Sequence, residues 1–244
     1  MVEKLTGRNI IKQSYGLNLS TYDLSEVSLN LLFTLLTEIT NDTKEICVFK
    51  VKISELHRKM NMEIKRNSYE KIAKELMSSP IKVTSETGTV NYYNWCSRFS
   101  FNTREGWLEM EIHKELKDYL TNLTSHFGIS YLNEFLQIKG SYAKRMYMIF
   151  RQYSKLKFVT FSIEELRNIL MLNDKFNLYA DMKKKVIVSA INNINKNSSL
   201  NISFEEFKVG RKVNSLKFNI VSERSSSLEH KAGVSATESW LENK

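Results

Sequence analysis

The sequence predicts an α+β protein made of two tandem copies of one helix-and-strand unit. The first observation is that a shift of 110 residues aligns residues 48–77 with residues 158–187 without a gap. Seven of these thirty positions are identical, and apolar positions match apolar positions along the segment. The second observation is the order in each copy: a short strand, two short helices joined by a turn, and then alternating runs typical of a β-hairpin. A helix-turn-helix with a β-hairpin appended is a winged helix, so we predict two tandem winged-helix domains related by internal duplication.

The composition fits a folded protein with two cores. The chain has 244 residues, 42% of them hydrophobic, and one proline, which is enough for two domains of about 100–120 residues. The first residues contain no hydrophobic signal segment, and no apolar run approaches the ~20 residues of a membrane span. We therefore expect a cytoplasmic protein without membrane association. Cys47 and Cys96 lack metal or redox spacing and lie in apolar runs, so buried thiols are expected.

The first unit is predicted to span residues 1–123. Leucines at spacings of three and four predict its first long helix, with Ser25 or Thr21 as the cap. Ser54 is expected to cap the next helix. From Ile81 onward the pattern alternates with period two, and turn signals interrupt it twice. The predicted elements are a helix over 23–40, a strand over 46–52, helices over 54–60 and 66–77, a three-stranded meander from 81, and a short helix near 114–120.

The second unit is predicted to span residues 124–221. Ser141 is expected to cap its long helix, and Ser162 with Glu165 has the spacing of a capping box. The serine-rich, aperiodic segment 222–244 is expected to be a disordered tail. The predicted elements are a helix over 142–154, a strand over 158–161, helices over 163–170 and 179–195, and strands over 201–208 and 214–221.

The positive charge is concentrated in the second unit. The whole chain has a net charge of +9. Residues 1–123 contain 17 basic and 16 acidic side chains, whereas residues 124–221 contain 16 and 7. Such a concentration favours a polyanionic ligand, most simply nucleic acid, contacted by the second unit. An incidental basic surface is the alternative that charge alone leaves open.

One face of the helix predicted over 179–195 is suited to the major groove of DNA. Six apolar residues form the arc expected to face the core. The opposite arc contains Lys184, Lys185, Val188, Asn192 and Asn195, and lysine and asparagine donate to phosphates, guanine or adenine edges. Lys183 lies on the flank of the core arc and is expected to reach a phosphate. A solvated helix face is the alternative.

Two further basic pairs are candidate phosphate contacts. Arg211 and Lys212 follow Gly210 in the tight turn of the last hairpin and are expected to project toward the DNA backbone or minor groove. Lys144 and Arg145 lie in the first turn of the helix that Ser141 is expected to cap, where free backbone N–H groups also favour a phosphate. Ordinary surface charge is the alternative for this second pair.

The corresponding helix of the first unit is nearly neutral. Glu70 and Glu75 stand where the second copy has Ala180 and Lys185. The two units are therefore expected to differ in function, with weaker DNA contact in the first. Aromatic residues of the predicted meander are expected either in the core or in a protein–protein contact: Tyr92, Tyr93, Trp95 and Phe99.

Catalytic motifs are missing from the sequence. The four histidines are scattered singly, so no His-x-His metal pair accompanies a nucleophilic tyrosine. No glycine begins the phosphate-binding motif G-x-x-x-x-G-K-[ST]. We expect no catalytic residue, no metal and no cofactor.

The chain resembles the iteron-binding plasmid replication initiators, a family with two winged-helix domains. The resemblance extends from about Arg8 to Val221 and depends on the order and spacing of several short motifs. These are Asn9-Ile10-Ile11, Ser14-Tyr15 and Leu19; Ser141-x-Ala143-x-Arg145-x-Tyr147 with Gln152-Tyr153; Glu164-Glu165-Leu166-Arg167; Tyr179-x-x-Met182-Lys183-x-Lys185-Val186 with Ala190-Ile191 and Asn195; and Lys208-x-Gly210-Arg211-Lys212-Val213.

The resemblance implies a function in plasmid replication. It implies binding to direct repeats of double-stranded DNA at an origin, opening of the strands with a host initiator protein, and recruitment of the replicative helicase. It also implies that monomers bind the repeats, while homodimers formed through the first domain repress the protein's own gene. A transcriptional repressor without a replication role, and a winged-helix module that binds proteins, are the alternatives.

Overall fold

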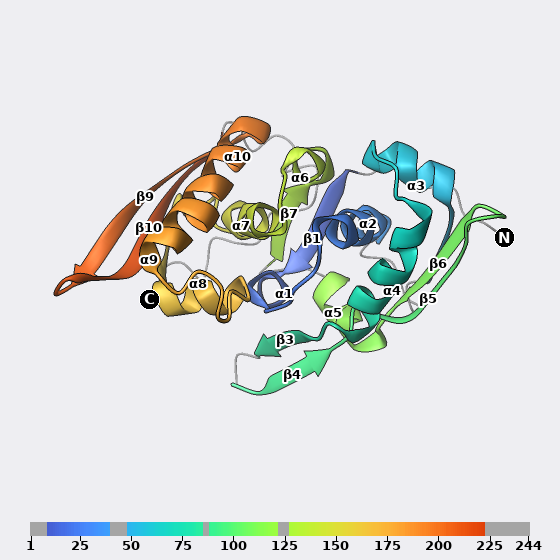
Figure 1. The fold of residues 1–244 in the computed structure, drawn as a ribbon, viewed down its shortest axis with the longest axis horizontal. Coiled ribbons are helices and arrows are strands. Elements are labelled where there is room, and N and C mark those ends of the chain that lie inside the picture. The colour runs from blue at the N-terminus through green and yellow to red at the C-terminus, as the bar shows by residue number, and fades with distance from the viewer. Residues whose placement is uncertain (1–8, 40–47, 85–87, 122–126, 223–244) are drawn as a thin grey trace.

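The computed structural model describes residues 9–39, 48–84, 88–121 and 127–222. Two winged units lie at the two ends of the long axis, and helix α7 (Ser141–Gln152) lies between them (Figure 1). The described residues contain no helix that is both long and apolar enough to cross a membrane.

The predicted duplication is confirmed at the level of topology. The first unit has a three-stranded sheet in the order β2-β6-β5, and the second has the order β8-β10-β9. The elements of the first unit are β2 (Val48–Lys52), α3 (Ile53–Met60), η1 (Arg66–Ser68), α4 (Tyr69–Ser78), β5 (Cys96–Asn102) and β6 (Trp107–Ile112). Those of the second are β8 (Phe158–Ser162), α8 (Ile163–Ile169), α9 (Tyr179–Met182), η3 (Lys183–Val188), α10 (Ser189–Asn197), β9 (Leu200–Val209) and β10 (Lys212–Ser222).

The predicted three-stranded meander is wrong. Strands β3 (Ile81–Thr84) and β4 (Val90–Tyr93) form a separate two-stranded sheet, while β5 pairs with β6 in the sheet of β2. The break falls at Trp95, which is fully buried. Its amide donates to the carbonyl of Leu76 and its carbonyl accepts from the amide of His113, both at 3.1 Å. These bonds hold the chain between helix α4 and strand β6, so β4 cannot turn directly into β5.

Two predicted helix starts are confirmed. Helix α2 (Glu26–Leu36) begins at Ser25, whose hydroxyl accepts from the amide of Ser28 at 3.3 Å. Helix α8 has the full capping box, because Ser162 accepts from the Glu165 amide and Glu165 accepts from the Ser162 amide. Each cap satisfies backbone donors that the first helical turn leaves free.

Two other predicted caps are wrong. Helix α3 begins directly after Lys52, with Ser54 already inside its first turn. Helix α7 begins at Ser141, and Gly140 occupies the cap position with a φ of 86°. A left-handed backbone angle at the cap suits glycine, so Gly140 and not Ser141 determines where α7 begins.

The centre of the molecule joins segments far apart in sequence. Strand β1 (Ile10–Ser14) pairs antiparallel with β7 (Phe127–Tyr131), across the predicted boundary between residues 123 and 124. Helix α7 is buried from Ala143 to Gln152 and packs against β7, α10, α1 (Tyr15–Leu19) and α2. The remaining elements near the centre are η2 (Lys114–Leu116), α5 (Lys117–Leu120) and α6 (Leu132–Gln137).

The cysteine prediction is confirmed for Cys96, which is 1% exposed. Burial raises the pKa of its thiol to about 12, so it remains protonated at neutral pH. Cys47 lies outside the described residues, as does the predicted tail from residue 223 onward.

Candidate nucleic-acid interface

Helix α9, the segment η3 and helix α10 form one continuous helical rod from Tyr179 to Asn197. Residues 183–188 are π-helical, a local widening that is frequent at functional positions. The core arc predicted for this rod is confirmed, since all six of its residues are 6% exposed or less: Met182, Val186, Ile187, Ala190, Ile191 and Ile194.

The predicted DNA-reading residues lie on the solvent side of the rod. Lys184, Lys185 and Asn192 are exposed, and Val188 is half-buried. Lys185 forms an ion pair with Asp181 one turn earlier, with Nζ 2.8 Å from the carboxylate. Lys184 and Asn192 are two i, i+4 steps apart, so they lie along one side of the rod.

Lys183 contacts the wing of the second unit, which is the hairpin of β9 and β10. Its Nζ lies 2.8 Å from Oε1 of Glu206 on strand β9, and the Tyr179 hydroxyl donates to the same oxygen at 2.5 Å. The hydrogen bond from Lys183, and to a smaller extent that from Tyr179, lowers the pKa of Glu206. The carboxylate is therefore ionised at neutral pH. Sequence reasoning did not identify Tyr179 or Glu206 as part of the site, because the contact depends on the register of β9.

The other end of the rod is also fixed to β9. Nδ2 of Asn195 donates to the carbonyl of Ile202 at 2.9 Å, and the amide of Ile202 donates to Oδ1 of Asn195 at 2.7 Å. Asn195 thereby completes the edge of β9 as a backbone strand would. The helix and the wing are therefore bonded to each other near both ends of the rod.

The second wing ends in a projecting basic turn. Its strands pair up to Val209 and Lys212, and the hairpin extends away from the body (Figure 1). Gly210 has a φ of 61°, which the tight reversal requires. Arg211 and Lys212 are exposed, as predicted for residues that reach a phosphate backbone.

The phosphate-contact prediction for Lys144 and Arg145 is wrong, because both side chains are buried, at 0% and 4% exposure. The ammonium of Lys144 donates to the carbonyl of Phe135. The guanidinium of Arg145 donates to the carbonyl of Ser20 and lies 3.7 Å from the Tyr22 ring centroid.

The start of helix α7 already binds a carboxylate. Oε2 of Glu26 accepts from the amide of Gly140 at 2.8 Å, so a carboxylate of α2 already occupies the position proposed for phosphate. Ser141 follows that cap and is half-buried. The Gly140 amide and Arg145 therefore bind the start of α7 to the first unit, and residues 141, 144 and 145 do not belong to the exposed basic surface.

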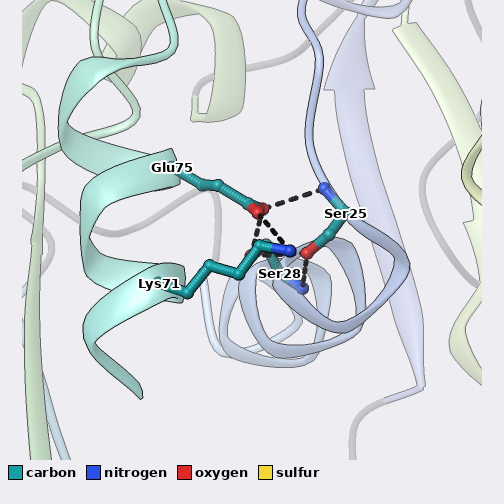
Figure 2. Close-up of polar contacts among 4 residues, drawn as sticks. All are labelled: Ser25, Ser28, Lys71 and Glu75. Atoms are coloured by element: carbon teal, nitrogen blue, oxygen red, sulfur yellow. Dashed lines mark hydrogen bonds and ion pairs between the residues drawn. The ribbon is translucent and has the colours of Figure 1, made fainter. Parts of the chain in front are cut away.

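In the first unit, Glu75 of helix α4 points toward Ser25 and Ser28 at the start of helix α2 (Figure 2). Its Oε2 accepts from the amide of Ser25 at 2.9 Å and from the hydroxyl of Ser28 at 2.7 Å. Glu75 thus caps helix α2 and does not make the outer face of α4 acidic. Glu70 is exposed and remains on that face.

An open cleft borders the junction of helix and wing in the first unit. It has a volume of about 620 Å³ and is lined by Arg66, Asn67, Glu70, Phe101, Asn102, Thr103 and Arg104. In the second unit the same region contains the Tyr179–Glu206–Lys183 contact. The two units therefore differ in this junction as well as in charge.

The four aromatic residues of the first unit have different environments. Trp95 is in the core, with its ring 5.0 Å from that of Tyr22 in an edge-to-face arrangement. Tyr93 and Phe99 pack partly against the core. Tyr92 is 64% exposed on strand β4 and is available for contact with a partner.

Comparison with protein families decides the identity of the fold. The model described as "Initiator Replication protein, WH1" matches residues 10–151, and "Initiator Rep protein, WH2" matches residues 162–220. The chain belongs to the initiator replication protein family. The first winged-helix module of this family extends through α7, which is the helix that the structure buries against α1 and α2.

The chain is also similar to solved structures. The crystal structure of Pi initiator protein in complex with iteron DNA is similar with a TM-score of 0.69 and 20% identity. The match covers 92% of this initiator and all of the Pi chain, at 100%. Domains 2 and 3 of RctB match with a TM-score of 0.45 and 12% identity, over 80% of this chain and 81% of that chain. No curated protein matches the sequence.

Proposed function

We propose that this protein is a non-enzymatic plasmid replication initiator that binds repeated double-stranded DNA at an origin. The observation that carries the proposal is that an exposed helix face and a projecting basic wing tip belong to elements bonded to each other. Lys184 and Asn192 lie on the helix, and Arg211 and Lys212 lie at the tip. Helix donors suit base edges in the major groove, and the wing cations suit the adjacent backbone.

Three further activities are proposed for the assembled origin complex. The protein helps to open the origin with a host initiator, recruits the replicative helicase, and represses its own gene as a homodimer through the first domain. Membership of the initiator replication protein family supports these steps. The exposed Tyr92 on β4 is available for a protein contact made by the first unit.

Binding to duplex DNA is tested first. Duplexes selected by the purified full chain from a random library are compared with scrambled duplexes of the same composition. Six to ten phosphate contacts predict that affinity falls about 10³–10⁵-fold between 50 and 200 mM salt. Salt-independent affinity, or equal affinity for selected and scrambled duplexes, contradicts sequence-specific DNA binding.

Replication is tested separately from DNA binding. A plasmid whose only replication functions are this gene and its flanking DNA is introduced into a host and followed for autonomous maintenance. Maintenance that is lost on deletion of the repeats supports an initiator. Duplex binding and gene repression without maintenance identify the protein as a transcriptional repressor.

A further inference from the structure

The two units carry different residues at matching positions where the helix meets the wing. Leu108 of β6 and Leu216 of β10 are equivalent, because each pairs with the fourth residue of the aligned strand, β2 or β8. On its other side Leu108 pairs with Phe101, and Leu216 pairs with Glu206. Phe101 and Glu206 therefore occupy the same position in the two wings.

The helix partners differ at matching positions. Tyr69 and Tyr179 are 110 residues apart, as are Ala73 and Lys183. In the first unit Tyr69 stacks on Phe101, with ring centroids 5.3 Å apart. In the second unit a carboxylate replaces the phenylalanine and a lysine replaces the alanine, and the two form an ion pair 2.8 Å long.

The hydroxyls of the two tyrosines also have different partners. The hydroxyl of Tyr69 lies 2.9 Å from Nε2 of His57 within its own unit. The hydroxyl of Tyr179 donates to Glu206 across the junction. The second unit thus replaces an apolar contact between helix and wing with a charged, three-residue contact on the surface proposed to face DNA.

We propose that Glu206 is a positioning residue in the second unit. It binds the start of the reading helix, the rod from Tyr179 to Asn197, to the wing and keeps Lys183 from the DNA backbone. This inference rests on the proposed duplex binding. An isolated surface ion pair contributes little, but here the carboxylate also accepts from Tyr179, so its position is fixed. A phosphate that approached Lys183 would have to displace Glu206 and would meet its negative charge.

The consequence is sequence selectivity. A lysine on the phosphate backbone strengthens binding to every duplex equally, whereas masking that lysine leaves binding dependent on base contacts. The repulsion between Glu206 and phosphate disfavours non-specific complexes in the same way. Lys184 and Asn192, which have no such carboxylate partner among the hydrogen bonds and ion pairs of the described residues, remain available for the duplex.

Glu206→Gln tests the masking, with Glu205→Gln as the matched control. Glu205 is the neighbouring carboxylate on β9, is exposed, and accepts from Asn219 on β10 instead of contacting the helix. Both variants remove one negative charge from the same strand. We expect Glu206→Gln to steepen the slope of log affinity against log salt by about 0.9, the value for one additional phosphate contact. Binding to scrambled duplexes should tighten about 5–10-fold near 0.1 M salt, and selectivity should fall accordingly, while Glu205→Gln changes the slope by less than a third as much.

Lys183 variants test the same masking if Glu206→Gln folds poorly. Lys183→Gln alone should leave the salt slope unchanged, and Lys183→Gln combined with Glu206→Gln should restore the wild-type slope. A Lys183→Gln variant whose slope falls by about 0.9 overturns the masking, because Lys183 then contacts phosphate. Equal slopes for the Glu206 and Glu205 variants also overturn it while leaving duplex binding intact. If the wild-type protein shows no salt-dependent duplex binding, the proposed function itself is wrong.

Discussion

Oε2 of Glu75 lies 2.7 Å from the hydroxyl oxygen of Ser28, so a carboxylate of helix α4 completes the cap of helix α2. The two residues are 47 positions apart in sequence. This bond fastens the predicted DNA-contact helix of the first unit to the long helix behind it. It also explains why an acidic residue stands at Glu75 although the protein is basic overall.

Glu75→Ala should lower the free energy of unfolding by about 1–3 kcal/mol, because the Ser25 amide and Ser28 hydroxyl lose a charged acceptor. Urea denaturation of the full chain measures the change. Glu70→Ala is the matched control, since it removes an exposed carboxylate from the first turn of the same helix and should change stability by less than about 0.5 kcal/mol. Equal effects of the two substitutions would show that Glu75 contributes only its charge.

The Glu75 cap should also weaken in acid. Burial alone raises the pKa of Glu75, but hydrogen bonds from Ser28 and Ser25 and the charge of Lys71 outweigh it and leave the pKa below its ordinary value. Because the unfolded state then binds the proton more tightly, the stabilisation is present above about pH 4.3 and is lost as pH falls through the folded pKa. The stability difference between wild type and Glu75→Gln should narrow as the pH falls below about 4.3.

Lys144→Met should leave duplex binding unchanged and should not destabilise the fold. Burial lowers the pKa of Lys144 to about 7, partly opposed by Glu26. In the unfolded chain a lysine has a pKa near 10.4, so wild-type stability should rise as pH rises from about 7 to 10. The methionine variant should lack this contribution and be equal to wild type or up to about 2 kcal/mol more stable at pH 7. Denaturation at pH 7 and pH 9.5 measures both points, and a reduced salt slope of DNA binding would restore Lys144 as a phosphate contact.

His57 should make the first unit sensitive to mild acid. Its Nε2 accepts from the Ile64 amide at 3.2 Å and lies 2.9 Å from the Tyr69 hydroxyl, and the bond from Ile64 needs an unprotonated Nε2. Burial lowers the pKa of His57, against an opposing effect of Glu63. Stability should therefore fall as pH decreases below about 6.5, by no more than about 1.4 kcal/mol per pH unit for one proton.

Hydrogen exchange of the α3–α4 turn locates this effect. Faster exchange there at pH 5.5 than at pH 7.5, after correction for the intrinsic rate, is the expected result. His57→Gln should remove most of the pH dependence. An unchanged profile in that variant would assign the acid sensitivity to other groups.

Substitutions in the reading helix and in the wing should differ in kind. Lys184→Ala and Asn192→Ala should each cost about 1–3 kcal/mol on the selected duplex and relax sequence preference. Arg211→Ala should weaken selected and scrambled duplexes alike and reduce the salt slope by about 1. Lys196→Ala, an exposed lysine near the end of the same helix, is the control. Binding isotherms at three salt concentrations separate these outcomes, and unchanged binding in all three variants would place the DNA surface elsewhere.

Local pattern was sufficient for most elements of the fold. The pattern within each copy of the repeat, the period of the helices and the Ser162–Glu165 spacing can each be read from a short segment, and the structure contains each of these elements. Apolar periodicity also identified the buried arc of the reading helix, from Met182 to Ile194. The spacing of apolar residues along the chain predicts which side chains are buried, so these features can be inferred from sequence.

The failures have a common cause in long-range packing. Sequence reasoning assigned the side chains of Lys144 and Arg145 to the surface, but inside the molecule they donate hydrogen bonds to the backbone carbonyls of Phe135 and Ser20. The meander failed at Trp95, whose burial against Tyr22 could not be read from alternating residues.

The amino-acid sequence by itself determined that this is a duplicated winged-helix protein with its positive charge in the second half, because periodicity and composition are local properties. Only the tertiary structure decided which charges face solvent and which are bonded inside. Lys183 and Glu206 meet through strand register, and Glu75 meets Ser28 through helix packing, so neither contact is encoded in the spacing of its own segment.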